Sequence, residues 1–316
     1  MTGIDDPFGI QPARWIIGPP APRGTAFLAR ACSLAIMVLV GHWVRVPLHG
    51  VGIKPETNGY PDGTNDTSKL FNWHPVLMTL GFVVFMAEAL LSYQAPIIPG
   101  LPREVRKRIH LGCHLAATVC VFLGFVAVLQ SHRLKLPDPM PDWYSPHSFL
   151  GLTAIALVGL QVLVGLYSYV WPRLGLSHRM ALGPLHRFWG AAAWLAALGA
   201  VATGLQEKVT FMQMKTLTRK DLFGPAVRLP AVVLPLLVVL ALLVLYHQVP
   251  PASKASTPEG FGGSPSPGGS GSSGSAGRMA SSRALLKGGR PAGEDEDEEE
   301  GEGSGDAEAA LGRRRV

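Results

Sequence analysis

The stretch YSPHSFLGLTAIALVGLQVLVGLYSYV, residues 144–170, contains no Lys, Arg, Asp or Glu. Its apolar part, 147–170, has about the 20 residues that a helix needs to cross the ~30 Å hydrocarbon core of a membrane. Pro146 suits the first turn of such a helix, where its missing N–H removes no hydrogen bond. The sequence predicts an all-α bundle of six transmembrane helices with both termini on one side, because five further stretches have the same character: 26–46, 74–94, 110–130, 186–206 and 226–247.

The composition of the 316 residues agrees with a membrane protein. Hydrophobic residues make up 47% and charged residues only 16%, below the roughly 25% typical of soluble domains. The basic residues lie in short pieces between apolar stretches, which argues against the clustered basic face of a nucleic-acid-binding protein. Cys32, Cys113 and Cys120 all fall inside the apolar stretches, so a disulfide framework or a cysteine-rich zinc cluster is excluded.

Three regions follow from the composition. Residues 1–25 are polar and rich in proline and show no cleavable signal peptide, so we expect a short N-terminal segment. Residues 26–247 are expected to form the transmembrane domain. Residues 248–316 are rich in Gly, Ser and charge, including the acidic run Glu294–Glu300, and they cannot bury enough apolar area to offset the entropy of ordering. We predict that they form a disordered tail.

The orientation in the membrane is weakly specified by the sequence. Residues 1–250 hold 20 basic and 11 acidic residues, a net charge of +9, but the loops on the two sides hold eight Lys and Arg residues each. The excess of positive charge that marks cytosolic loops is therefore missing. The long charged tail favours cytosolic termini, because it would be hard to thread across a membrane. Asn65-Asp66-Thr67 is an N-glycosylation acceptor sequence, usable only if its loop is lumenal.

Four histidines stand at the start of four successive apolar stretches: His74, His110, His147 and His186. Ionisable side chains inside a membrane are costly and point to function. Since successive helices run in opposite directions, His74 and His147 share one face of the membrane, and His110 and His186 share the other. No carboxylates or thiolates accompany them to complete a zinc or di-iron site. Two histidines at one depth suit the axial positions of a haem iron, so we predict two bis-histidine haem sites.

Spacing alone leaves several alternatives open. His114 lies on the same helix face as His110, and either could be the ligand. Gly151 and Gly190 each follow a histidine by four residues, where a glycine makes room for a flat macrocycle or for close packing of helices. The same histidines could instead form a proton relay in a transporter or channel without haem. A receptor-like scaffold that acts through the acidic tail is a third class.

Six segments of the chain resemble the cytochrome b561 family, the ascorbate-reducible transmembrane di-haem proteins, over about residues 25–247. The resemblance implies two b haems, cytosolic termini and a homodimer, and it favours His110 over His114 as the ligand. The last segment is most similar to plant members, which implies a vacuolar or other endomembrane, with the plasma membrane as an alternative. The segments are FNWHPVLM (71–78), EALLSY (88–93), KRIHL (107–111), YSPHSFLG (144–151), PLHRFWG (184–190) and TGLQEKVTF (203–211).

A basic cluster near His110 fits a site for an anionic reductant. Arg103, Lys107 and His110 fall at steps of four and three residues on one stripe of a helix, which Pro102 would start. The family resemblance implies that these cations bind cytosolic ascorbate beside the haem, with Lys107 taking part in catalysis and Arg179 as a third basic residue. The cluster could also serve as a positive anchor on the cytosolic side of the membrane.

On the opposite face, the resemblance implies a second substrate site at His132 and Tyr144, with His132 taking part in catalysis. Tyr144 lies three residues before the ligand His147. The chain departs from the family pattern here in two ways. Ser131 stands where plant members carry an aromatic residue, and the loop from His132 to Tyr144 is longer by a few residues.

Together these features predict a transmembrane oxidoreductase. Cytosolic ascorbate would give one electron to the haem on its own side, and the electron would pass through the second haem to a non-cytosolic acceptor. Bis-histidine ligation leaves no open iron position, which disfavours oxygen activation. The acceptor is expected to be monodehydroascorbate or a ferric chelate, and the residues do not choose between them. His114 and His132 are candidates for moving the proton that ascorbate loses.

Overall fold

The computed structural model describes residues 22–214 and 224–248. The prediction of an all-α bundle with six spans is confirmed, because six helices are long and apolar enough to cross a membrane. Within the described ranges, one isolated antiparallel bridge joins Glu56 and Asp66. The predicted N-terminal segment and tail lie almost wholly outside the described residues. The six spans are Gly24–Arg45, Ser68–Leu91, Arg103–Arg133, Pro146–Tyr169, Leu176–Met214 and Pro225–Tyr246.

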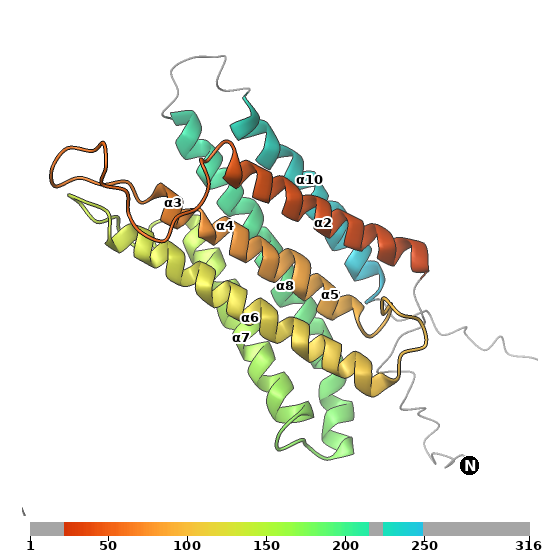
Figure 1. Cartoon of the computed structure of the whole chain (residues 1–316). Helices are drawn as coiled ribbons and strands as arrows, with labels where there is room; N and C mark the ends of the chain where they lie inside the picture. The colour runs from red at the N-terminus through yellow and green to blue at the C-terminus, as the bar shows by residue number, and fades with distance from the viewer. Residues whose placement is uncertain (1–21, 215–223, 249–316) are drawn as a thin grey trace, which may run out of the picture. The chain divides into compact units, whose positions relative to one another are not determined.

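The spanning helices run side by side (Figure 1). Helix α2 (Arg23–Arg45) packs along α10 (Pro225–Tyr246), and α7 (Pro146–Tyr169) packs along α8 (Leu176–Met214). Helix α6 (Arg103–Arg133) packs along the second span but makes few contacts with α7. The α2–α10 pair lies on one side of the bundle and α7 on the other (Figure 1). The second span, α6, α7 and α8 carry the four histidines.

The two ends of the described chain lie together. Thr25 Oγ1 in the first turn of α2 is 3.2 Å from His247 Nε2, just after α10. Gln248 Nε2 donates a hydrogen bond of 2.9 Å to the backbone oxygen of Leu90. The described chain therefore begins and ends at one end of the bundle, as an even number of crossings requires. We call this end, where α6 and α8 begin, the His110 end, and the opposite end the His74 end.

The second span is a composite helix. It consists of α3 (Ser68–Phe71), α4 (Trp73–Met78), the seven-residue π-helix η1 (Thr79–Phe85) and α5 (Met86–Leu91). A π-helix changes the register of the backbone hydrogen bonds and is frequent at functional sites.

Backbone oxygens of η1 accept hydrogen bonds from neighbouring helices. Trp194 Nε1 of α8 donates to Phe82 O at 2.9 Å, and Ser33 Oγ of α2 donates to Val83 O at 2.7 Å. Gly81 faces α6 so closely that a Cβ there would lie 3.0 Å from Val121 Cγ2. The middle of the bundle is therefore packed tightly around η1.

An ion pair joins α2 to α5 inside the spans. Arg30 donates to both carboxylate oxygens of Glu88, at 2.7 and 2.8 Å, and also to the backbone oxygen of Ala95 at 2.7 Å. Charged side chains at membrane depth pair with each other or with backbone carbonyls because an isolated charge there is costly. This pair anchors α5 to α2 at Glu88, the residue before Ala89, whose backbone oxygen contacts His110.

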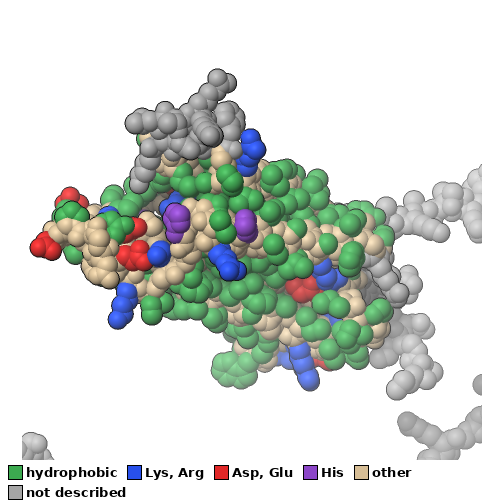
Figure 2. All heavy atoms as spheres, turned by 45° about the horizontal axis from the view of Figure 1, so that its top comes forward, with side chains coloured by type: hydrophobic (Ala, Val, Ile, Leu, Met, Phe, Trp, Pro, Cys, Tyr) green, Lys and Arg blue, Asp and Glu red, His purple; other side chains and the backbone are tan. Residues whose placement is uncertain are grey.

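The outer surface of the bundle is apolar. Phe27, Phe122, Leu163 and Leu242, from four different spanning helices, are 63–70% exposed. Figure 2 shows hydrophobic side chains over most of the visible face. Large exposed apolar surfaces of this kind mark contact with a membrane or a partner. Because the spans are also long enough to cross a bilayer, the chain is an integral membrane protein.

Candidate functional site

The four predicted histidines form two pairs, one at each end of the bundle. The ring centroids of His110 and His186 are 6.4 Å apart, and those of His74 and His147 are 6.1 Å apart. A metal–nitrogen bond of about 2.0–2.1 Å on each side, with about 1.1 Å from nitrogen to ring centre, gives roughly 6 Å between centroids. Both spacings therefore fit a metal ion held between two imidazoles.

The apolar stretches were expected to begin at the four histidines, but three of the four spans begin further upstream. His147 is the second residue of α7, whereas His74, the second residue of α4, lies six residues after Ser68, where its span begins. Helix α6 begins seven residues before His110, and α8 begins ten residues before His186. Both helices start before the apolar stretches. Their first turns contain polar residues, which can stay in contact with water outside the membrane core.

Backbone oxygens fix one histidine of each pair. His110 Nδ1 lies 2.8 Å from Ala89 O, and His74 Nδ1 lies 3.0 Å from Gly124 O. A carbonyl oxygen only accepts, so Nδ1 carries the proton in both residues and Nε2 is left as a metal ligand. Such a hydrogen bond orients the ring and raises the basicity of a ligand.

His114 lies beside His110 in a different environment. Its ring centroid is 4.5 Å from that of His110 on the same helix, too close for a metal ion to sit between the two rings. Its Nδ1 is buried and has no hydrogen-bond partner among the described residues. The oriented ring of His110, opposite His186, favours His110 as the ligand.

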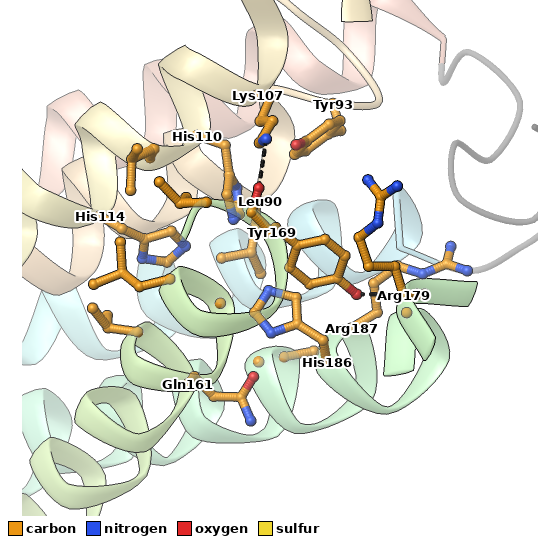
Figure 3. Close-up of a pocket in the computed structure, with 18 of the residues that line it drawn as sticks. Leu90, Tyr93, Lys107, His110, His114, Gln161, Tyr169, Arg179, His186 and Arg187 are labelled. Carbon is orange, nitrogen blue, oxygen red and sulfur yellow. Dashed lines mark hydrogen bonds between the residues drawn. The ribbon is translucent and has the colours of Figure 1, made fainter. Parts of the chain in front are cut away.

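A cavity of about 500 Å³ surrounds the His110–His186 pair (Figure 3). Its volume is within the range of about 300–1,000 Å³ that is common for ligand and cofactor sites. Apolar residues of α5, α6, α7 and α8 form most of its wall, including Leu90, Leu111, Val158 and Leu166. The opening exists because α6 and α7 approach each other only loosely.

Several buried polar atoms around this cavity lack a protein partner. Within the described part of the chain, these are Gln161 Oε1, Arg179 Nε, His114 Nδ1 and His186 Nδ1. A buried polar atom without a hydrogen-bond partner destabilises the folded protein by about 1–3 kcal/mol. Such atoms are therefore rare in native proteins. Their concentration here, with the imidazole spacing, fits a cavity that holds a flat haem and an adjacent polar molecule.

The three basic residues predicted for ascorbate, Arg103, Lys107 and Arg179, all line this cavity. Lys107 Nζ donates to the backbone oxygen of Tyr169 at 2.7 Å, and the Tyr169 hydroxyl donates to the backbone oxygen of Arg179 at 3.4 Å (Figure 3). Helix α6 begins at Arg103, directly after Pro102, as predicted. The turn between α7 and α8 thus comes into contact with the start of α6.

Other polar residues of this cavity were missed by the sequence reasoning. Tyr93 has its ring centroid 5.2 Å from that of His110. Burial raises the pKa of Tyr93 to about 12, so its phenol is neutral at physiological pH. The end of α7, the α7–α8 turn, α8 and the residues after α10 contribute further polar lining residues: Tyr169, Arg173, Arg187 and Gln248.

At the His74 end, the predicted pair His132 and Tyr144 lies together. The ring centroids are 6.3 Å apart. His132 Nδ1 is 3.1 Å from Asp142 Oδ1, a partner that the sequence reasoning did not single out. Burial and then the negative charge of Glu207 raise the pKa of Tyr144, which keeps the phenol neutral. A histidine oriented by a carboxylate can exchange a proton through its other nitrogen.

Glycines near the histidine pairs differ in their surroundings. Of the two singled out from sequence, Gly190 lines the His110 cavity, whereas a Cβ at Gly151 would meet nothing within 4 Å. Two others approach the histidines more closely. A Cβ at Gly165 would lie 3.4 Å from His186 Cε1, and one at Gly204 only 2.6 Å from His147 Cε1. Gly204 therefore makes room for His147.

Asn65, the residue of the glycosylation sequence, serves a structural contact. It is 4% exposed, its Nδ2 donates to Leu134 O at 2.7 Å, and its Oδ1 accepts from Leu136 N at 2.9 Å. Lys135 Nζ also donates to its backbone oxygen. A glycan on Nδ2 would compete with the bond to Leu134 O and would have no room at this buried position, so the folded chain does not offer Asn65 as a surface acceptor.

Comparison with known proteins agrees with this arrangement. A family model described as eukaryotic cytochrome b561 matches residues 73–212. The chain is 36% identical over 141 residues to the plasma membrane ascorbate-dependent reductase CYBRD1 of Xenopus tropicalis, which covers 45% of this chain and 49% of that protein. It is 36% identical over 182 residues to the lysosomal membrane ascorbate-dependent ferrireductase CYB561A3 of Mus musculus, which covers 57% and 73%.

A plant relative gives a similar match. The chain is 33% identical over 151 residues to transmembrane ascorbate ferrireductase 2 of Arabidopsis thaliana, which covers 48% of this chain and 63% of that protein. The chain spans about half the length of the frog relative and nearly three quarters of the mouse relative. With the matching histidine-bearing helices, these similarities establish that the chain belongs to the cytochrome b561 family.

Proposed function

We propose that this protein carries electrons across a membrane from ascorbate, through two b haems, to monodehydroascorbate or a ferric chelate on the other side. The observation that carries the proposal is the presence of two imidazole pairs, with centroids 6.4 and 6.1 Å apart, at opposite ends of one bundle. Each pair of histidines would hold one b haem, which would supply one-electron transfer. The names of the frog, mouse and plant relatives support ascorbate as the donor.

At the donor end, the residues of this chain bind and orient the reductant. Ascorbate is an anion, and Arg103, Lys107 and Arg179 supply positive charge around the cavity of His110. The hydrogen bond from Lys107 to Tyr169 O holds the ammonium in a defined place. Lys107 is therefore assigned to ascorbate binding and catalysis. His114, whose Nδ1 lacks a partner in the described part of the chain, is assigned to accept the proton that ascorbate loses.

At the acceptor end, His132 and Tyr144 form the proposed second substrate site. Asp142 holds His132 Nδ1, which leaves His132 Nε2 to donate the proton that monodehydroascorbate takes up when one electron reduces it to ascorbate. Tyr144 offers a neutral hydroxyl as a hydrogen-bond donor. A ferric chelate would need no proton, so the His132–Asp142 pair supports monodehydroascorbate as one acceptor without excluding iron.

The proposal includes the orientation of the chain in the membrane, the membrane in which it resides and its oligomeric state. The described chain begins and ends at the His110 end, so cytosolic termini place the ascorbate site in the cytosol. We propose an endomembrane, vacuolar or similar, with the plasma membrane as the alternative, since the relatives include a lysosomal and a plasma membrane protein. A homodimer is proposed from the family resemblance.

Lys107→Gln is expected to raise the KM for ascorbate about tenfold or more, because a hydrogen bond to a charged group is worth about 1.5–3 kcal/mol. Haem content and the rate of reduction by dithionite are expected to stay unchanged, which separates substrate binding from folding. Arg108→Gln is the matched control, because Arg108 is an exposed neighbour on α6 that does not line the cavity. Equal KM values for the two variants would remove Lys107 from the ascorbate site.

A further inference from the structure

The middle of the bundle contains a hydrogen-bonded indole that lies halfway between the two histidine pairs. Trp194 is fully buried, and its Nε1 donates to Phe82 O of η1 at 2.9 Å. On its own helix, Trp194 follows His186 by eight residues and precedes Gly204, the neighbour of His147, by ten. Phe82 follows His74 by eight residues and precedes Ala89, the partner of His110, by seven.

The distance between the two histidine pairs is large for direct contact of their cofactors. Along α6, His110 and Gly124, whose backbone oxygen contacts His74, are 14 residues apart, which is about 21 Å at 1.5 Å per residue. The cavity of His110 extends along α8 as far as Ala193, the residue before Trp194. Trp194 is therefore the next residue of α8 beyond the cavity in which we propose that the haem of the His110 end is bound.

The π-helix η1 creates this arrangement. Its backbone oxygen at Phe82 accepts the indole N–H, and its oxygen at Val83 accepts the hydroxyl of Ser33 from α2. On the third side, Gly81 packs against α6 with 3.2 Å between an added Cβ and Ala117 O. The indole is thus bonded to η1, and η1 is itself held by α2 and packed against α6. Trp194 is fully buried at this level of the bundle.

We propose that Trp194 is the bridging residue through which the electron passes between the two haems, and that η1 positions it. This rests on the proposed function. One electron would pass from a reduced haem held by His110 and His186 to a ferric haem held by His74 and His147, so that the first is oxidised as the second is reduced; the indole would be neither oxidised nor deprotonated. Electron tunnelling decays more steeply through a void than through packed atoms, and a buried aromatic ring fills this layer at the density of a protein interior.

The test uses the full chain in vesicles with the His110 end outward and ascorbate added outside. In Trp194→Leu, half of the haem absorbance is expected to be reduced at the normal rate and the other half on the order of tenfold more slowly, because the smaller side chain leaves a cavity in the path. In Trp194→Phe, which keeps an aromatic ring, we expect a smaller loss. Trp194→Met replaces the leucine variant if the latter fails to retain haem.

Trp43→Leu is the matched control. Trp43 is 1% exposed, and its Nε1 donates to Ala226 O at 2.8 Å, but it joins α2 to α10, which carry none of the four histidines. This variant is expected to reduce both haems at the normal rate. Haem count and the midpoint potentials of both haems are measured in every variant, so that a slower phase is not mistaken for a lost or shifted cofactor.

A second readout does not depend on electron transfer. In the full chain with haem bound, the indole N–H of Trp194, identified by its absence in Trp194→Phe, is expected to exchange slowly with deuterium because it is buried and bonded to Phe82 O. Trp194→Leu with both haems bound and single-phase, normal reduction would overturn the inference, as would equal slowing in Trp43→Leu. If the unaltered chain binds no haem, or ascorbate reduces none of it, the proposed function itself fails.

Discussion

Replacing His110 with alanine is expected to leave one haem per polypeptide, whereas replacing His114 with alanine is expected to leave two. His110 faces His186 at 6.4 Å and is oriented by Ala89 O. His114 contacts His110 at 4.5 Å on the same helix and has no such orienting partner in the described part of the chain. The number of haems per polypeptide is measured from the absorbance of the pyridine haemochrome in the purified protein. The spectrum of the haem that remains, compared with that of the unaltered protein, identifies the site that still binds it.

The paired variants act as controls for each other, because both remove an imidazole from the same cavity. Loss of a haem in His114→Ala, with both retained in His110→Ala, would exchange the assignments. His74→Ala extends the test to the other end: it is expected to remove the haem that His110→Ala leaves. The double variant is then expected to be colourless.

Gly204→Ala is expected to remove the haem of the His74 end and to leave the other intact. A Cβ at this position would lie 2.6 Å from His147 Cε1 and 3.0 Å from its Nε2, closer than real contacts allow, so the ring must leave its place opposite His74. A displaced ligand loses most of its bond to the iron, because coordination requires a distance near 2 Å. The haem count and the reduced-minus-oxidised spectrum report the loss.

Gly199→Ala on the same helix is the control for this substitution. A Cβ at Gly199 would meet Leu150 Cδ2 at 3.6 Å, an ordinary van der Waals contact, so two haems are expected to remain. Retention of two haems with normal spectra in Gly204→Ala would show that His147 is not held against this glycine. Thermal unfolding of both variants separates a local loss of haem from a general loss of stability.

The sequence predicted the spans and the pairing of histidines because both depend on local patterns. Twenty apolar residues specify a span without reference to other helices. The alternation of direction then places His74 with His147 and His110 with His186. The start of α6 at Arg103 was also predicted, because Pro102 is a local signal. The start of α8 was not, since Leu176 carries no comparable signal and the helix accommodates Pro184.

Contacts between distant residues were outside the reach of the sequence. Nothing in the chain marks Ala89 or Gly124 as acceptors for histidine, since the contacting group is a backbone oxygen. The π-helix and its bond to Trp194 depend on three helices packing together. The pair Arg30–Glu88 spans 58 residues. Gly151 and Gly190 were predicted from their spacing to a histidine on the same helix. Gly204 could not be predicted in this way, because it contacts His147 from another helix.

The presence of one bis-histidine haem at each end is tested most directly by the purified full chain itself. Haem is counted per polypeptide, and a reduced-minus-oxidised spectrum is recorded with ascorbate as the reductant. We predict two b haems per chain, both reducible by ascorbate. A colourless preparation, or a single haem that persists when His110 and His74 are both replaced, would contradict the proposed arrangement.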